Sequence, residues 1–232
     1  MSLNNNIPKY MLNLANLKNA NSKQLSWLLN WRCIHRHSGI RHFSCFLKES
    51  GFTERKGWFD IETSNLKANF GIILCWCILD EQGNRYEDVI NLDDVRSGNE
   101  DKRLIENCIS CFSNFDRLIG HYSTYFDIPF VRTRALIHGI KFPTYGTLYH
   151  TDVWKMARKS LCLHSNRQDV IAESLYGKTC KTRISHPAWR KAMLGDEKAA
   201  ALVLHHCQKD VVDLKKNYLT LLPYCSEVKS SI

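Results

Sequence analysis

Long apolar runs are missing from this 232-residue sequence. No stretch approaches the ~18 consecutive apolar residues of a membrane-spanning helix, and no basic amphipathic helix of the membrane-surface kind stands out. The N-terminus is rich in Asn and Lys and lacks the apolar core of a secretory signal. No internal repeat is visible. These absences disfavour membrane and secreted proteins, and they predict a cytoplasmic protein with no membrane partner.

Acidic residues are also scarce, because 23 Asp and Glu stand against 32 Lys and Arg, a formal net charge of +9. Cationic side chains gain affinity for polyanions by releasing counterions, so this excess points to a nucleic-acid partner, with general solubility as the alternative. The ten cysteines are scattered through predicted elements, as Cys75 and Cys77 illustrate. In a reducing compartment we expect most of them to be small buried hydrophobic residues.

The chain divides into two parts. Residues 1–50 are polar and Asn-rich, with a short helix predicted at 22–31 that Ser22 caps. Residues 54–225 predict one domain in which strands come first and helices later. The predicted strands are 57–63, 70–79, 86–90 and 118–120, and the predicted helices are 101–111, one after Asp127, 152–160, 166–176, 187–193 and 197–221. This order is typical of an α/β fold, a mixed sheet with helices on both faces.

Two carboxylates, Asp60 and Glu62, stand two residues apart in the segment WFDIET at 58–63. Residues at this spacing project from one face of a strand, and their apolar neighbours predict a central strand. Buried carboxylates are costly unless a positive group neutralises them, and a divalent cation with oxygen ligands does so. For such a pair taken alone, a solvated strand end is the alternative interpretation.

Two further acids lie in matching settings. Asp127, in HYSTYFDIPF at 121–130, follows an apolar strand and precedes a helical pattern, so it lies at a strand-to-helix turn. Asp210, in HHCQKDV at 205–211, lies on a long helix whose apolar stripe includes Val203, Cys207 and Val211. An acid on that helix is able to face the sheet, so both acids join Asp60 and Glu62 as candidate metal ligands.

The chain resembles a DEDD-type 3′–5′ exonuclease of the ribonuclease H-like superfamily, of the prokaryotic and phage type. The three motifs of that family are matched in order, over residues about 57–220, by FDIET, YFDIPFV and HHCQKDV. The resemblance implies a ribonuclease H-like mixed sheet flanked by helices. It implies two-metal hydrolysis of phosphodiester bonds, with Mg²⁺ or Mn²⁺ held by Asp60, Glu62, Asp127 and Asp210. It also implies that Thr63 holds the terminal 3′-OH and that Leu66 wedges against the last base.

The expected substrate is nucleic acid, DNA being favoured, at single-stranded or frayed 3′ ends. Two alternatives stay open. One is a structure-selective endonuclease or ribonuclease of the same fold. The other is a non-catalytic, zinc-containing nucleic-acid binding module, against which the complete set of four acids argues. The family usually has Asn where Tyr122 stands, which leaves the substrate contacts at that position undefined.

A histidine is expected to assist the attacking water. The family uses either a His five residues before the last acid or a Tyr four residues before it, and His205 and His206 occupy these two positions. Around a helix, His206 lies ~40° from Asp210 and His205 lies ~140° away. An imidazole accepts a proton near neutral pH. This spacing favours His206 as the catalytic base, with His205 as the alternative.

The N-terminal part holds five potential zinc ligands within the 13 residues 33–45. Zinc takes four nitrogen or sulfur ligands in a tetrahedron, and a small loop without a core folds around it. The prediction is a zinc-knuckle-like segment with a structural Zn²⁺ on Cys33, His37, His42 and Cys45, with His35 as the alternative to His37. A basic loop that touches phosphate is the competing interpretation.

Three weaker features have simpler explanations. Asp152 is expected to cap a helix rather than to bind a metal, and Asp213 is expected to be solvated or paired with Lys216. Several cationic residues precede the last helix, and they line either a strand-binding groove or a solvated face: Lys178, Lys181, Arg183, Arg190 and Lys191.

Overall fold

The structure is a computed structural model that describes residues 26, 29–39, 41, 45, 54–180, 182–225 and 230–231. Within these residues a six-stranded sheet has the order β3-β2-β1-β4-β5-β6. β1 pairs antiparallel with β2 and parallel with β4, so it lies in the middle of the sheet. The strands are β1 (Lys56–Thr63), β2 (Ile73–Asp80), β3 (Arg85–Val89), β4 (Arg117–Gly120), β5 (Tyr149–Asp152) and β6 (Ser230–Ser231).

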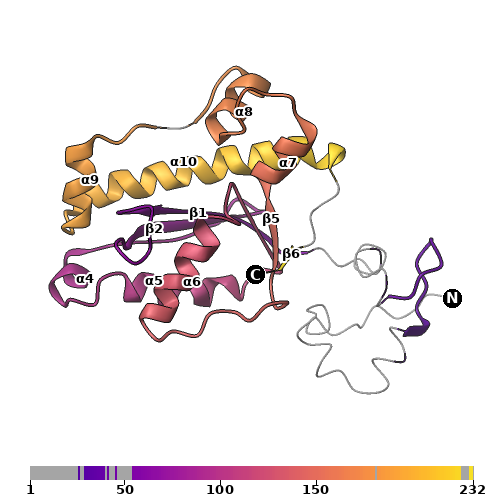
Figure 1. The fold of residues 1–232 in the computed structure, drawn as a ribbon, viewed down its shortest axis with the longest axis horizontal. Coiled ribbons are helices and arrows are strands. Elements are labelled where there is room, and N and C mark those ends of the chain that lie inside the picture. The colour runs from indigo at the N-terminus through magenta and orange to yellow at the C-terminus, as the bar shows by residue number, and fades with distance from the viewer. Residues whose placement is uncertain are drawn as a thin grey trace.

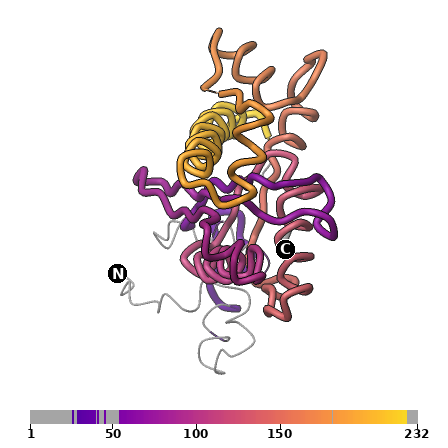
Figure 2. Tube along the Cα trace, turned by 90° about the vertical axis from the view of Figure 1, so that its left-hand side faces the viewer, coloured from indigo at the N-terminus to yellow at the C-terminus, as the bar shows by residue number. Residues whose placement is uncertain are grey.

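Helices cover both faces of this sheet (Figure 1). One layer holds α4 (Leu92–Arg96), α5 (Lys102–Phe112) and α6 (Asp127–Ile137). The other holds α7 (Val153–Ser160), α8 (Gln168–Tyr176), α9 (His186–Met193) and the long α10 (Glu197–Leu221), after which comes a 3₁₀ turn, η2 (Leu222–Tyr224). Figure 2 shows the strands between α10 and the magenta helices of the first layer. The predicted α/β fold, a mixed sheet flanked by helices, is confirmed.

Alternation along β1 decides which residues face which layer. The Trp58 ring packs edge-on against Tyr218 of α10 at 5.8 Å between centroids, and the Phe59 ring packs against Phe112 of α5 at 5.3 Å. Side chains two apart on a strand share a face. Asp60 and Glu62 therefore lie on the face of Trp58, toward α10.

The neighbouring strand β2 is buried along its whole length, ILCWCILD. A strand covered on both faces has no solvated side, so its sequence is a continuous apolar run rather than an alternation. This strand begins at Ile73 and not at the predicted residue 70. The backbone N–H groups of Phe70 and Gly71 donate to the carbonyl of Lys67, which makes 67–71 a turn.

The helix α4 was not predicted, because five residues are too few for a helical pattern to show. It is held by a capping box, in which the Asn91 side chain accepts from the Asp94 N–H and the Asp94 side chain accepts from the Asn91 N–H. The predicted helix at 22–31 falls mostly outside the described residues, although Ser26, Leu29 and Asn30 are helical. Among the residues that the structure describes, no helix is long and apolar enough to span a membrane.

Candidate active site

Three elements bring the predicted acids together. Asp60 and Glu62 lie on β1, Asp127 begins α6, and Asp210 lies in the middle of α10. α10 packs directly on β1, where the Cys207 thiol contacts the Asp60 carbonyl oxygen at 3.4 Å. Burial raises the pKa of Asp60 well above its usual range, and the charges of Glu62, Asp127 and Asp210 raise it further. The four carboxylates therefore form one electrostatically coupled cluster.

Asp127 is the deepest member of this group, with 4% of its surface exposed. Burial raises its pKa to about 7, and the nearby carboxylate of Asp152 adds to the rise. Backbone N–H groups of Asp127 itself and of Ile61 act in the opposite direction, because they stabilise the charged form. A carboxylate in this setting is stabilised most when a cation neutralises its charge.

His206 lies on the same side of α10 as Asp210. Its Nε2 is 3.5 Å from Glu62 Oε1 and 3.8 Å from Asp210 Oδ2, whereas its Nδ1 lies 2.7 Å from the Thr182 hydroxyl. The Thr182 contact fixes the ring so that Nε2 faces the acids. His205 is exposed to solvent. Sequence reasoning missed Thr182, because a hydroxyl 24 residues from its partner carries no local signal.

The chemistry of this donor set fits a hard divalent cation. Glu62, His206 and Asp210 each offer a ligand atom, and these three atoms lie within 4.8 Å of one another. The Oδ2 atom of Asp60 is buried and has no hydrogen-bond partner among the described residues. A buried carboxylate oxygen without a donor is costly, and an ion with oxygen ligands relieves that cost. Mg²⁺ and Mn²⁺ are therefore compatible with the carboxylates present.

The two predicted substrate contacts follow the acids along the chain. Thr63 ends β1 at a register shift in its pairing with β2, and its hydroxyl donates to the Asn65 carbonyl at 2.9 Å. Such bulges bend a strand and re-aim its side chains. Leu66 lies in the loop that follows and is 78% exposed. An apolar side chain is thus presented to solvent beyond the acid-bearing end of β1.

The Cys/His segment also brings side chains together. A tight turn, in which the Cys33 N–H donates to the His37 carbonyl, returns His35 toward Cys33. His35 Nδ1 lies 3.5 Å from the Cys45 sulfur and 3.9 Å from the Cys33 sulfur. The structure therefore groups the two cysteines with His35, the alternative ligand, whose ring centroid is 6.4 Å from that of His37. His42 lies outside the described residues.

Two of the weaker candidates are now placed. Asp152 caps α7 as predicted, since its carboxylate accepts from the Trp154 N–H at 3.0 Å. The expectation for Asp213 was wrong. This residue is buried, and its carboxylate accepts from the Thr179 hydroxyl and from the Cys180 N–H, each at 2.7 Å. It therefore fixes the segment after α8, while the Lys216 ammonium lies over the Tyr176 ring.

A pocket of about 390 Å³ opens on the acids. Its lining combines two of the predicted ligands with residues that sequence reasoning did not assign to the site, namely Asp60, His121, Tyr122, Trp154, Arg167, Gln168 and Asp210. The Gln168 side chain donates to the Asp210 carbonyl at 2.8 Å, which joins α8 to α10 beside the site. Asp60 and Asp210 are thus accessible to a substrate from this side.

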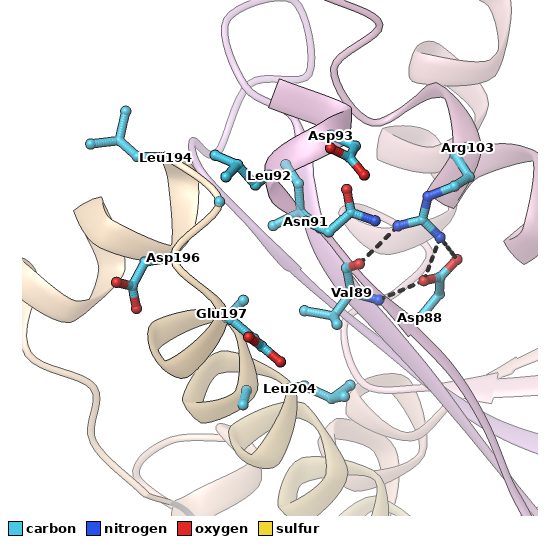
Figure 3. A pocket seen from close by; sticks show the side chains of 14 residues that line it. Asp88, Val89, Asn91, Leu92, Asp93, Arg103, Leu194, Asp196, Glu197 and Leu204 are labelled. Carbon is cyan, nitrogen blue, oxygen red and sulfur yellow. Dashed lines mark hydrogen bonds and ion pairs between the residues drawn. The ribbon is translucent and has the colours of Figure 1, made fainter. Parts of the chain in front are cut away.

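A larger pocket, of about 980 Å³, lies elsewhere, between the β3–α4 segment and the start of α10 (Figure 3). Three of its charged side chains, Asp88, Arg103 and Asp196, serve the fold. Arg103 bridges Asp88 at 2.7 Å and Asp94 at 2.8 Å, and Asp196 caps α10. These contacts hold α4 and α5 against β3, so the pocket's size does not make it the reactive site.

Comparison with known proteins agrees with this architecture. The chain belongs to the RNase_H superfamily, whose family model matches residues 58–221. It therefore has a ribonuclease H-like nuclease fold, as predicted. No curated protein matches the sequence.

Among solved structures, the family B DNA polymerase from the hyperthermophilic archaeon Pyrobaculum calidifontis is similar, with a TM-score of 0.59 and 17% sequence identity. The likeness covers 74% of this chain and 25% of the polymerase chain. At this level of identity it shows a shared fold, and this chain spans about a quarter of that protein's length.

Proposed function

We propose that this protein is a metal-dependent 3′–5′ exonuclease that hydrolyses phosphodiester bonds at single-stranded or frayed ends, DNA being favoured. The observation that carries the proposal is the convergence of four acids from β1, α6 and α10, which raises the pKa of Asp60 through burial and through the other three charges. Such a group is most stable around divalent cations, which is the chemistry of two-metal phosphoryl transfer.

Each residue has a role in this proposal. The ligands for Mg²⁺ or Mn²⁺ are Asp60, Glu62, Asp127 and Asp210. Ions bound there would supply Lewis acidity that activates water and stabilises the leaving 3′ oxygen. In the tautomer whose Nδ1–H donates to the Thr182 hydroxyl, the His206 Nε2 lone pair faces Glu62 and Asp210, where it would accept the proton of the attacking water.

The residues after β1 support cleavage from a strand end rather than within a strand. Thr63 and Leu66 succeed the two β1 acids along the chain, and the exposed Leu66 is available to pack against a terminal base. A strand end held there leaves its last phosphodiester bond at the acids. The competing mode, internal cleavage, needs no such end contact, so Leu66→Ala distinguishes the two modes by its effect on end-dependent cleavage.

The deciding experiment uses end-labelled DNA and RNA oligonucleotides with Mn²⁺. We expect a ladder of products shortened from the 3′ end, and we expect Asp60→Asn, Asp127→Asn and Asp210→Asn each to abolish it while the variants stay folded. Glu106→Gln, an exposed acid on α5, is the matched control and keeps wild-type activity. Discrete internal cuts would support an endonuclease, and near-wild-type cleavage by Asp60→Asn would overturn the site assignment.

We further propose that the N-terminal segment binds a structural Zn²⁺ through Cys33, His35 and Cys45. The grouping of two thiols and one imidazole within 4.8 Å supports it, because soft ligands select zinc over magnesium. Elemental analysis should find about one zinc per chain, lost in Cys33→Ser/Cys45→Ser and in His35→Ala. The matched variant His37→Ala tests the other histidine. Negligible zinc in the wild type would leave the segment as a basic loop.

A further inference from the structure

Three aromatic side chains form a cluster on the rim of the acid pocket. Tyr122 and Tyr125 come from the turn before α6, and Trp154 comes from the first turn of α7. The Tyr122 ring centroid is 5.1 Å from that of Tyr125 and 5.3 Å from that of Trp154. Tyr122 and Trp154 line the same pocket as Asp60 and Asp210. The cluster is therefore next to the acids.

These rings are held in place although they face solvent. Tyr122 is 45% exposed and Tyr125 is 55% exposed. The buried carboxylate of Asp152 accepts from the backbone N–H groups of Tyr122 at 2.9 Å, Thr124 at 3.0 Å and Trp154 at 3.0 Å. One side chain thus joins the Tyr122 turn to the start of α7 and fixes the relative position of the three rings.

The backbone at Tyr122 is strained, which also indicates that its position is enforced. Its φ is +60°, in the left-handed region that a bulky residue rarely adopts. Such strain persists only where the surroundings enforce it, commonly at ligand sites. Beneath the turn, the buried Ser123 hydroxyl lies 2.8 Å from His150 Nε2, which anchors it to β5. The fold therefore maintains an exposed, strained aromatic residue beside the acids.

Cations flank the cluster on α7. The Lys155 ammonium lies 5.0 Å from the centroid of the Tyr125 ring, and the Arg158 guanidinium lies 5.2 Å from that of Trp154. Cations at this distance from a ring are attracted to its face and remain able to contact phosphate. Aromatic rings combined with a positively charged track are the features that bind single-stranded nucleic acid, because every base has a face to stack.

We propose that Tyr122, Tyr125 and Trp154 form a base-stacking subsite that selects unpaired nucleotides. The inference rests on the proposed function and adds to it the residues that select an unpaired strand. In a duplex the bases are stacked on one another and their faces are covered, whereas a single strand offers them to the rings. Lys155 and Arg158 would contact the phosphates between the stacked bases, and the adjoining phosphodiester bond would lie at the acids.

Binding measured without metal separates this subsite from catalysis. The 232-residue chain in EDTA is titrated with a fluorescein-labelled dT oligonucleotide and with an abasic oligonucleotide of equal length, and binding is followed by fluorescence anisotropy. A lost base stack weakens binding roughly 5- to 150-fold by its usual free energy. We expect such a loss for Tyr122→Ala and for Trp154→Ala on the dT oligonucleotide only, with Trp154→Phe keeping most of the affinity.

The chain supplies its own controls. Tyr145 and Tyr224 are exposed tyrosines, 86% and 77%, outside the pocket lining, and Tyr145→Ala and Tyr224→Ala should bind like wild type. Thermal melting checks that each variant is folded, and Tyr125→Ala replaces any that is not. The subsite is overturned if the rim variants bind dT as wild type does, or if they lose affinity for the abasic oligonucleotide equally. If the rim variants lose affinity for dT as expected but the wild type cleaves no oligonucleotide, only the proposed nuclease activity is refuted.

Discussion

At the scale of single residues, burial sets the charge of the acid cluster. The Asp127 carboxyl has a pKa of about 7 in the folded protein, against 3.8 for an unperturbed aspartate. Between these values the folded state holds a proton that the unfolded state has lost, so stability falls as pH rises through the window from about 4 to 7. The protonated cluster is the more stable one in the absence of a cation.

The raised pKa of Asp127 predicts a measurable difference in how stability depends on pH. In metal-free protein, raising the pH from 5 to 8 should lower the melting temperature of the wild type more than that of Asp127→Asn, whose amide stays neutral. Melting curves in EDTA at several pH values test it, with Glu106→Gln as the exposed control. Parallel pH dependence in wild type and Asp127→Asn would show that this carboxyl is ionised at little cost.

The choice between two adjacent histidines is also a matter of one residue. His206 faces Glu62 and Asp210, and His205 faces solvent. A positioned general base contributes roughly 10²- to 10⁴-fold to a rate, so His206→Ala should lower single-turnover hydrolysis by that range while His205→Ala stays near wild type. Thr182→Val, which removes the ring's hydroxyl partner, should cause a smaller loss. A large loss in His205→Ala alone would reverse the assignment, and two small losses would mean that bound metal activates the water unaided.

At the scale of elements, one buried carboxylate joins a strand and two helices. Asp101, at the start of α5, is 0% exposed. Its carboxylate accepts from the Ile73 N–H of β2 at 2.7 Å and pairs with Arg134 of α6 at 2.7 Å. His138 Nε2 also lies 2.7 Å from it. The packing of α5 and α6 against the beginning of β2 therefore depends on this group.

Removing the Asp101 carboxylate should leave the Arg134 guanidinium without its buried partner. Asp101→Ala is expected to lower the free energy of unfolding by about 3–5 kcal/mol, since it breaks a buried pair and leaves Arg134 with only its exposed acidic partner, Glu100. Glu100→Ala is the matched control, because Glu100 also pairs with Arg134 but is 53% exposed on its side chain, and exposed pairs contribute about 0–1 kcal/mol. Urea denaturation measures both. Equal losses would contradict the distinction between the buried and the exposed partner.

Elements with strong local patterns were predictable from the sequence. The bounds of α10, 197–221, follow from its apolar stripe, and β1 follows from an apolar segment around two acids. What failed either depended on distant partners or was too short to show a pattern. Asp213 gave no sign of its bonds to Thr179 and Cys180, and α4 is too short for a periodic signal. Local patterns fix elements, whereas contacts across the chain remain hidden.

The candidate site was likewise predictable from the sequence only where local patterns defined it. The four acids stood out because each lies in a motif whose neighbours fix a strand end or a helix face. The aromatic cluster did not stand out, since Trp154 joins Tyr122 only once β5 lies beside β4 in parallel register. Gly120 pairs with Asp152 in that register, which brings the following turn and α7 together. A sequence alone shows neither the register nor the Asp152 bonds that depend on it.

At the scale of the whole molecule, the net charge of +9 provides long-range attraction for a polyanion. The acids that bind cations locally oppose this attraction, so the positive residues near the pocket matter more than the total. Lys155 and Arg158 lie on α7 beside the aromatic cluster, whereas Lys102 is exposed on α5, in the opposite layer. Comparing substitutions of Lys155 or Arg158 with a substitution of Lys102 distinguishes attraction by the overall charge from attraction by the positive residues of α7.

Salt dependence gives the last prediction. In EDTA, the logarithm of the affinity for a dT oligonucleotide should fall linearly with the logarithm of salt, with a slope near −0.7 for each phosphate neutralised on a single strand. Contact with about four phosphates then gives roughly 50-fold weaker binding at 200 mM than at 50 mM salt. Lys155→Ala and Arg158→Ala should each reduce the slope by about one contact, and Lys102→Ala should leave it unchanged, as anisotropy titrations at four salt concentrations would show. If Lys102→Ala changes the slope as much as Lys155→Ala does, the attraction comes from overall charge and not from α7. A slope near zero in the wild type would mean that the protein does not bind its substrate through phosphates.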